Sequence, residues 1–139
     1  MRGLFLFIGF FILSLHAEDV HAEECTPSEF SGNWQNVRGE KNILSALEVV
    51  DTCDADGPFG AVRTRAKELC HPRDCSWGWV RAEIEGNQLF AEFNTFIAKR
   101  RIVAVPQGLK LRVVVETDYI TESREDTRVE HLLVRSAGQ

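Results

Sequence analysis

Short runs of alternating apolar and polar residues follow one another along the sequence after Cys25. The clearest run is residues 109–116, in which leucine or valine occupies every second position and mainly charged residues lie between. A period of two places alternate side chains on opposite faces of a β-strand. The pattern predicts eight strands separated by turn residues, at 34–38, 43–51, 61–66, 77–84, 89–95, 102–105, 109–116 and 129–135.

Eight short strands at roughly even spacing are typical of an antiparallel sandwich or barrel. We expect an all-β fold, an eight-stranded antiparallel up-and-down barrel, with a β-sandwich as the alternative. Residues 23–139 are then a single domain, in keeping with their length. Residues 61–69 are ambiguous, because their Ala, Arg, Lys, Glu and Leu content also suits a short helix.

The alternation also predicts which side chains share a face. In the second strand Ile43, Ser45, Leu47 and Val49 fall on one face. In the last strand His131 is in phase with its apolar neighbours, so we expect a hydrogen-bonded core histidine.

The N-terminus has the three parts of a secretory signal peptide. Arg2 precedes twelve almost entirely apolar residues, 4–15, and small-residue cleavage patterns end at Ala17 and Ala22. An apolar run of that length is shorter than the roughly 20 residues that span a bilayer. We therefore expect residues 1–22 to be a signal peptide, the mature chain to be secreted or periplasmic, and no membrane span.

All four cysteines follow this signal, and an even number in an exported chain favours two disulfides. Three pairings are possible. In an up-and-down meander Cys25 and Cys53 lie at one end and Cys70 and Cys75 at the other, so we expect Cys25–Cys53 and Cys70–Cys75. The spacings lack the paired Cys-x-x-Cys form of zinc sites, so we expect no metal and no cofactor.

The segment from Cys70 to Trp79 holds two of the three tryptophans and is the candidate working end. A constrained loop lowers the ordering cost of binding, and Trp and Arg are enriched among residues that dominate binding energy. The predicted ligand- or partner-binding residues are His71, Arg73, Asp74, Trp77 and Trp79. Alternatively, the disulfide only holds a turn.

Two orientations of the tryptophans are possible. If Gly78, Val80 and Ala82 face the core, both Trp77 and Trp79 point outward. A β-bulge would instead turn one indole inward.

The run Phe30-Ser31-Gly32-Asn33-Trp34 resembles the Phe-x-Gly-x-Trp signature of lipocalins, and avidins carry a similar Gly-x-Trp. This resemblance implies a calycin-like barrel. It also implies that Trp34 packs at the closed end under a basic residue of the last strand, Arg128 or Arg135. The biotin-contacting residues of avidins have no counterparts here, so biotin is not implied.

The chain also resembles small exported bacterial proteins of undefined function. Their pattern is Gly-x-Trp-x-Asn-Val followed by Cys-His-Pro-x-Asp-Cys-x-Trp-Gly. The matching residues are Gly32, Trp34, Asn36, Val37, Cys70, His71, Pro72, Asp74, Cys75, Trp77 and Gly78. This resemblance implies a fold and a disulfide but no activity.

The remaining chemistry favours binding over catalysis. No Gly-x-Ser-x-Gly, His-Glu-x-x-His or phosphate-binding loop is present, and oxidised cysteines offer no thiolate. Net charge is −5, acidic and basic residues are interleaved, and Lys99-Arg100-Arg101 is the one basic cluster, so we expect no nucleic-acid partner. We expect a binder of a small apolar molecule and no enzyme. The alternative is a protein-interaction module, such as an inhibitor or envelope-associated partner, with an exposed aromatic patch.

Overall fold

The computed structural model describes residues 26–38, 44–52 and 62–137. These residues form eight β-strands. The predicted strands are confirmed, most of them with shifted ends. They are β1 (Gly32–Asn36), β2 (Leu44–Asp51), β3 (Val62–Glu68), β4 (Cys75–Glu85), β5 (Gln88–Asn94), β6 (Ala98–Gln107), β7 (Lys110–Tyr119) and β8 (Thr127–Arg135). The ambiguous segment is strand β3, not a helix, because its alternate residues Thr64 and Ala66 are completely buried.

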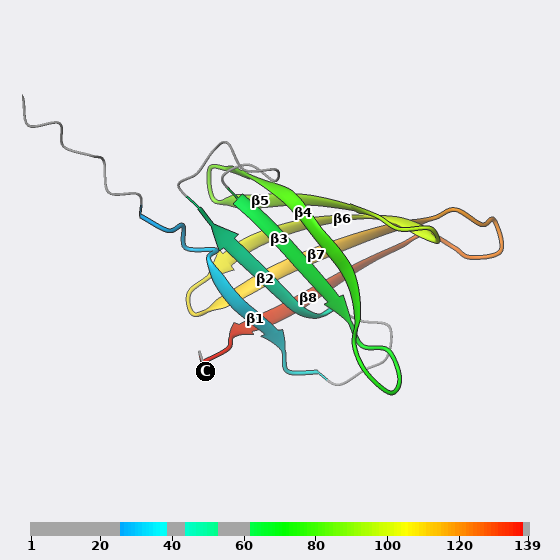
Figure 1. The fold of residues 1–139 in the computed structure, drawn as a ribbon, viewed down its shortest axis with the longest axis horizontal. Helices are drawn as coiled ribbons and strands as arrows, with labels where there is room; N and C mark the ends of the chain where they lie inside the picture. Colours follow the sequence, from blue (N-terminus) through cyan, green and yellow to red (C-terminus); the bar gives the residue numbers. More distant parts are fainter. Residues whose placement is uncertain (1–25, 39–43, 53–61, 138–139) are drawn as a thin grey trace, which may run out of the picture.

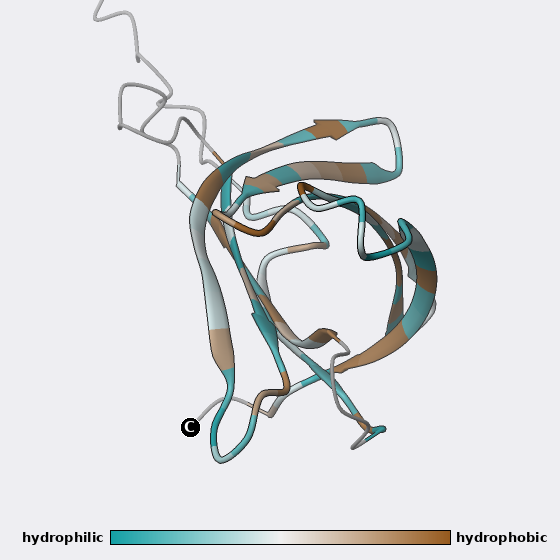
Figure 2. Cartoon of the chain, turned by 90° about the vertical axis from the view of Figure 1, so that its right-hand side faces the viewer, coloured by the Kyte–Doolittle hydropathy of each residue, from teal (hydrophilic) through white to brown (hydrophobic). Residues whose placement is uncertain are grey.

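Each strand pairs antiparallel with its neighbour in sequence, and β1 pairs with β8 to close a barrel (Figure 1). The predicted up-and-down barrel is thus confirmed and the sandwich alternative is wrong. In the turned view the strands curve around a common axis, and apolar and polar residues alternate along several of them (Figure 2). Closure lets the apolar face of every strand pack against the others.

The two ends of the barrel differ in what lies there. The β3–β4, β5–β6 and β7–β8 hairpins project toward the right of Figure 1, and we call this the open end. The β4–β5 and β6–β7 hairpins and residues 26–31 lie at the other, closed end.

Large apolar side chains fill the middle of the barrel. Completely buried apolar side chains in this cluster include Leu47, Leu89, Phe93, Ile102, Leu111, Val113 and Leu133. Burial of this apolar surface is the main favourable contribution to folding. The interior therefore holds packed side chains below the open end.

Trp34 plugs the closed end, as predicted, and is only 3% exposed. Its Nε1 donates a hydrogen bond of 2.8 Å to the carbonyl of Phe30. The guanidinium of Arg135 lies 4.3 Å from the indole centroid and donates to the carbonyls of Glu29 and Ser31. Arg135 is therefore the basic residue over Trp34, whereas Arg128 pairs with a glutamate outside the barrel.

Gly32 makes room for this arrangement. Its φ is +128°, and a Cβ there would come within 2.5 Å of Nη1 of Arg135. Only glycine combines that backbone angle with that close approach.

The predicted face of β2 is wrong at its start. A register shift between Leu44 and Ala46 in the β2–β3 ladder buries Leu44 and leaves Ser45 half-buried. Ile43 lies outside the described residues. A bulge of this kind moves the alternation by one position, which the sequence pattern does not reveal.

Removal of the closed-end plug tests this fold. We expect Trp34→Ala to lower the free energy of unfolding by about 3–5 kcal/mol, the usual cost for a buried aromatic. Urea unfolding followed by circular dichroism measures it. Leu109→Ala, at a residue that is 91% exposed, is the control and should cost less than ~0.5 kcal/mol. A cost below ~1 kcal/mol for Trp34→Ala would contradict the packing.

Candidate functional site

A β-bulge in β4 decides where the two neighbouring tryptophans point. Arg65 pairs with Trp79 and Lys67 with Ser76, so two steps along β3 match three along β4. Gly78 supplies the positive φ, +90°, within the bulge. As a result Trp77 faces the interior and packs against the core, whereas Trp79 lies on the outer wall with Arg65. The bulge alternative is confirmed, and the expectation that both indoles point outward is wrong.

Trp77 has partners on three sides. Its ring meets Phe93 edge to face, with centroids 5.5 Å apart. Its Nε1 donates a 3.0 Å hydrogen bond to Glu68 Oε2, and the guanidinium carbon of Arg100 lies 4.6 Å from its centroid. Aromatic and cation–π contacts of this kind fix the ring rigidly.

Arg100 and Glu68 form an ion pair inside the barrel, at 3.3 Å between Nη2 and Oε2. Their side chains are 5% and 18% exposed. Arg100 also donates to Thr95 Oγ1 at 3.2 Å. Taking two charges out of water is costly unless each is paired and hydrogen-bonded, which this network achieves.

The floor of a hollow at the open end is formed by Glu68, Trp77 and Arg100. This hollow has a volume of about 630 Å³. We call it the mouth hollow. It is lined by Glu68, Cys70, Cys75, Ser76, Trp77, Thr95, Phe96, Ile97, Arg100, Tyr119, Arg124, Glu125 and Thr127.

Two large apolar side chains are exposed at the rim of the mouth hollow, beside the polar residues Ser76, Arg124, Glu125 and Thr127. Phe96 is 92% exposed and Ile120 is 65% exposed, at the tips of adjacent hairpins. A backbone hydrogen bond of 3.1 Å from Ile120 to Ile97 joins these hairpins. Exposed apolar groups gathered at one place are typical of a binding surface.

The disulfide Cys70–Cys75 is confirmed, with an S–S distance of 2.08 Å and a Cα–Cα distance of 5.6 Å. Cys25 and Cys53, the other predicted pair, lie outside the described residues. A disulfide is compatible with an extracellular or periplasmic location.

The predicted binding residues do not all meet. Of the five, only Trp77 lines the mouth hollow. His71, Arg73 and Asp74 are exposed on the loop beside it, where Asp74 accepts a 2.7 Å hydrogen bond from Ser45.

Four residues that line the mouth hollow were not predicted as site residues: Glu68, Thr95, Phe96 and Arg100. Arg100 belongs to the one basic cluster of the sequence, but alternation along β6 sends only its neighbours Lys99 and Arg101 outward. Arg100 is two positions before Ile102, so the alternation of a strand places it on the same inward face, and this pattern could have identified it.

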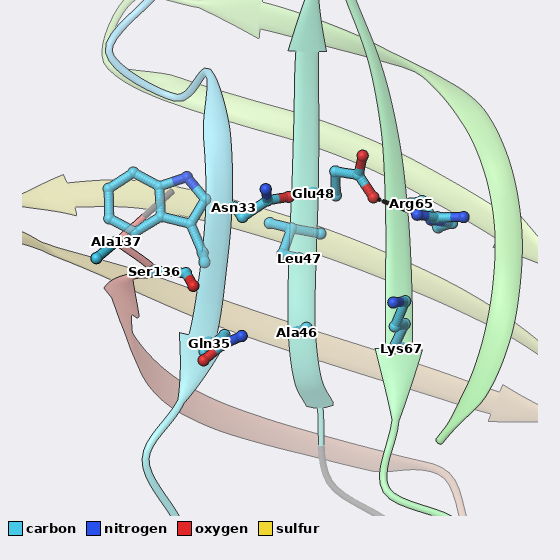
Figure 3. Close-up of a pocket in the computed structure, with 10 residues that line it drawn as sticks. Asn33, Gln35, Ala46, Leu47, Glu48, Arg65, Lys67, Ser136 and Ala137 are labelled. Atoms are coloured by element: carbon cyan, nitrogen blue, oxygen red, sulfur yellow. Dashed lines mark hydrogen bonds and ion pairs between the residues drawn. The ribbon is translucent and has the colours of Figure 1, made fainter. Parts of the chain in front are cut away.

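A second hollow, of about 660 Å³, lies on the outer wall over β1, β2 and β3 (Figure 3). Most of its lining is polar: Asn33, Gln35, Glu48, Arg65, Lys67 and Ser136, with Trp34, Ala46, Leu47 and Ala137. Figure 3 shows Glu48 and Arg65 joined by an ion pair across β2 and β3. We call it the outer hollow.

His131 is a buried histidine, 8% exposed, as expected for a core position. Its Nδ1 lies 3.4 Å from Nδ2 of Asn36. Burial lowers the pKa of His131 below its ordinary value, and the positive charge of Arg38 lowers this pKa further.

Within residues 26–38, 44–52 and 62–137, no three His, Cys, Asp or Glu side chains are grouped as metal ligands. That part of the chain also has no helix long and apolar enough to cross a membrane.

Comparison with known proteins found no matching family model, no similar curated protein and no similar solved structure. The two sequence resemblances remain predictions.

Loss of the Cys70–Cys75 disulfide should cost modest stability, since the closed loop is short. We expect Cys70→Ala with Cys75→Ala to lower the free energy of unfolding by about 2 kcal/mol, the chain-entropy value for such a loop. Urea unfolding of the oxidised wild type and the variant measures it. An unchanged free energy of unfolding would show that the disulfide does not constrain the unfolded chain.

His131 should make stability fall in mild acid. In the unfolded chain His131 binds a proton near the ordinary pKa of about 6.5. In the folded chain the pKa of His131 is lowered, so the proton binds only at lower pH. The free energy of unfolding is therefore highest above pH 7 and falls as pH drops through 6.5 toward the lowered folded pKa. Unfolding curves between pH 7.5 and 5.5 should show a shallower dependence in His131→Gln than in the wild type. Identical slopes would contradict this assignment.

Proposed function

We propose that the protein binds a small molecule with an apolar body in the mouth hollow. The observation that carries this proposal is the hollow of about 630 Å³ whose floor is the Trp77, Arg100 and Glu68 network. Small-molecule sites are typically concave, of 300–1,000 Å³, and combine apolar walls with a few fixed polar groups.

The lining supports a ligand with one polar end. Trp77, Phe96, Ile97 and Tyr119 offer apolar and aromatic surface. The polar floor is already ordered, because Glu68 holds both the indole nitrogen and the guanidinium. A preorganised floor orients a ligand without a further entropy cost.

The packed core limits how deep such a ligand reaches. Phe93 lies beneath Trp77 and is completely buried. A ligand would therefore rest at the open end of the barrel, between the hairpins, rather than along its axis. Export of the mature chain would expose this end to extracellular or periplasmic molecules.

The alternative function is a protein-interaction module that docks through the rim. The exposure of Phe96 (92%) and Ile120 (65%) favours it, because large exposed apolar side chains gather at protein interfaces. Neither function assigns a reaction to the site.

A neutral dye tests the small-molecule function. We expect N-phenyl-1-naphthylamine to bind the wild type saturably, with one site, and Phe96→Ala to weaken binding about five- to tenfold through lost apolar contact, roughly 1–1.4 kcal/mol. Fluorescence titration measures both dissociation constants. Phe96 is exposed, so its truncation should not unfold the chain.

Leu109→Ala is the matched control, because Leu109 is equally exposed at the closed end. Saturable binding that Phe96→Ala leaves unchanged would place the dye elsewhere. Absence of dye binding, with a protein captured by the wild type and not by Phe96→Asp, would favour the interaction module.

A further inference from the structure

The outer wall of β3 and β4 carries four cationic side chains and one indole, and two of the cations contact that indole. Arg63, Arg65 and Lys67 occupy alternate positions of β3 on the outer face. Arg81 of β4 lies directly opposite Arg63 in the ladder, and Trp79 lies opposite Arg65. We call Arg63, Arg65, Lys67, Arg81 and Trp79 the outer basic patch.

Like charges placed directly opposite each other destabilise a sheet. Glu48 offsets Arg65 through a 2.5 Å ion pair. No carboxylate of the described chain forms an ion pair with Arg63, Lys67 or Arg81, and the Nε of Arg63 is buried without a hydrogen-bond partner there. The patch is also opposite in sign to the chain, whose net charge is −5. No ion pair among the described residues therefore offsets the repulsion between Arg63 and Arg81.

Trp79 holds the guanidinium groups in place. The Cζ atoms of Arg63 and Arg65 lie 5.0 Å and 4.8 Å from its ring centroid. Cation–π contacts keep both planar groups ordered at the surface. Ordered guanidinium groups bind sulfate, phosphate or carboxylate oxygens through two parallel hydrogen bonds.

The outer hollow adjoins this patch and has different chemistry. Arg65 and Lys67 belong to both. The hollow adds the amides of Asn33 and Gln35 and the hydroxyl of Ser136, which both donate and accept hydrogen bonds (Figure 3). Such groups match the hydroxyls of a sugar ring.

We propose that the outer wall over β1–β4 binds an acidic polysaccharide. The acidic groups of the chain bind the outer basic patch, and a neighbouring hydroxyl-bearing ring lies over the outer hollow. A polymer of this kind presents both anions and hydroxyls, and the wall presents cations beside hydrogen-bonding amide and hydroxyl groups. The site faces away from the barrel interior, so it is independent of the mouth hollow.

One feature disfavours a nucleic acid as the occupant. Single-stranded nucleic acids bind through several stacking aromatics along a groove, whereas this patch has one, Trp79.

The test compares dextran sulfate with uncharged dextran by isothermal titration calorimetry. We expect the wild type to bind dextran sulfate and not dextran, and Arg63→Gln with Arg81→Gln to weaken binding at least tenfold. The matched control is Arg112→Gln with Arg128→Gln, which removes the same charge from the outer face of β7 and β8 and should change affinity less than twofold. Trp79→Ala should weaken binding three- to tenfold, because the guanidinium groups lose their support.

A second readout separates binding from structure. Because Arg63 and Arg81 repel each other, their double variant should melt at the same temperature as the wild type or higher. Equal weakening in the control pair, unchanged affinity in Arg63→Gln with Arg81→Gln, or equal binding of uncharged dextran would each overturn the proposal. Tighter binding of a single-stranded oligonucleotide than of dextran sulfate would overturn the polysaccharide assignment.

Discussion

Closure of the sheet through β1 and β8 is the constraint on which the rest of the structure depends. Among the described residues, three pairs join these strands, from Trp34–Arg135 to Asn36–Leu133. Arg135 reinforces this short ladder, because one guanidinium stacks on Trp34 and donates to two carbonyls of the entering chain. Closure removes the free edges of the sheet and gives every strand an inner face and an outer face. Both candidate sites follow from that division.

The bulge at Gly78 assigns one tryptophan to each face. Without it, Trp77 and Trp79 would share the outer face, since they are two positions apart on one strand. With it, Trp77 joins Glu68 and Arg100 inside, and Trp79 joins Arg63 and Arg65 outside. One extra residue in β4 therefore supplies the floor of the mouth hollow and the centre of the outer basic patch.

Period and composition predicted the strands and the disulfide loop, and the resemblance to the lipocalin signature implied the burial of Trp34. The sequence pattern did not predict which face Arg100 takes, because the predicted strand covered only residues 102–105, whereas β6 begins at Ala98. It also missed the outer basic patch. Arg63, Arg65 and Lys67 occupy every second position of one segment, so a β-strand there places all three on the same face. That segment was also compatible with a helix, which would have dispersed these charges. A one-residue shift of register reverses every face, so bulges limit such reasoning most.

The two sites treat charge in opposite ways, and their surroundings explain why. Inside the barrel Arg100 is 5% exposed and needs Glu68, since an unpaired buried charge is strongly destabilising. On the outer wall water screens Arg63 and Arg81, so their mutual repulsion is tolerable without a carboxylate. Because Glu68 neutralises Arg100, the interior pair can orient a ligand but attracts an anion only weakly. Surface cations without an ion-pair partner attract an anion from a distance. This difference in charge compensation supports the proposal of an apolar ligand for the mouth hollow and of a polyanion for the outer wall.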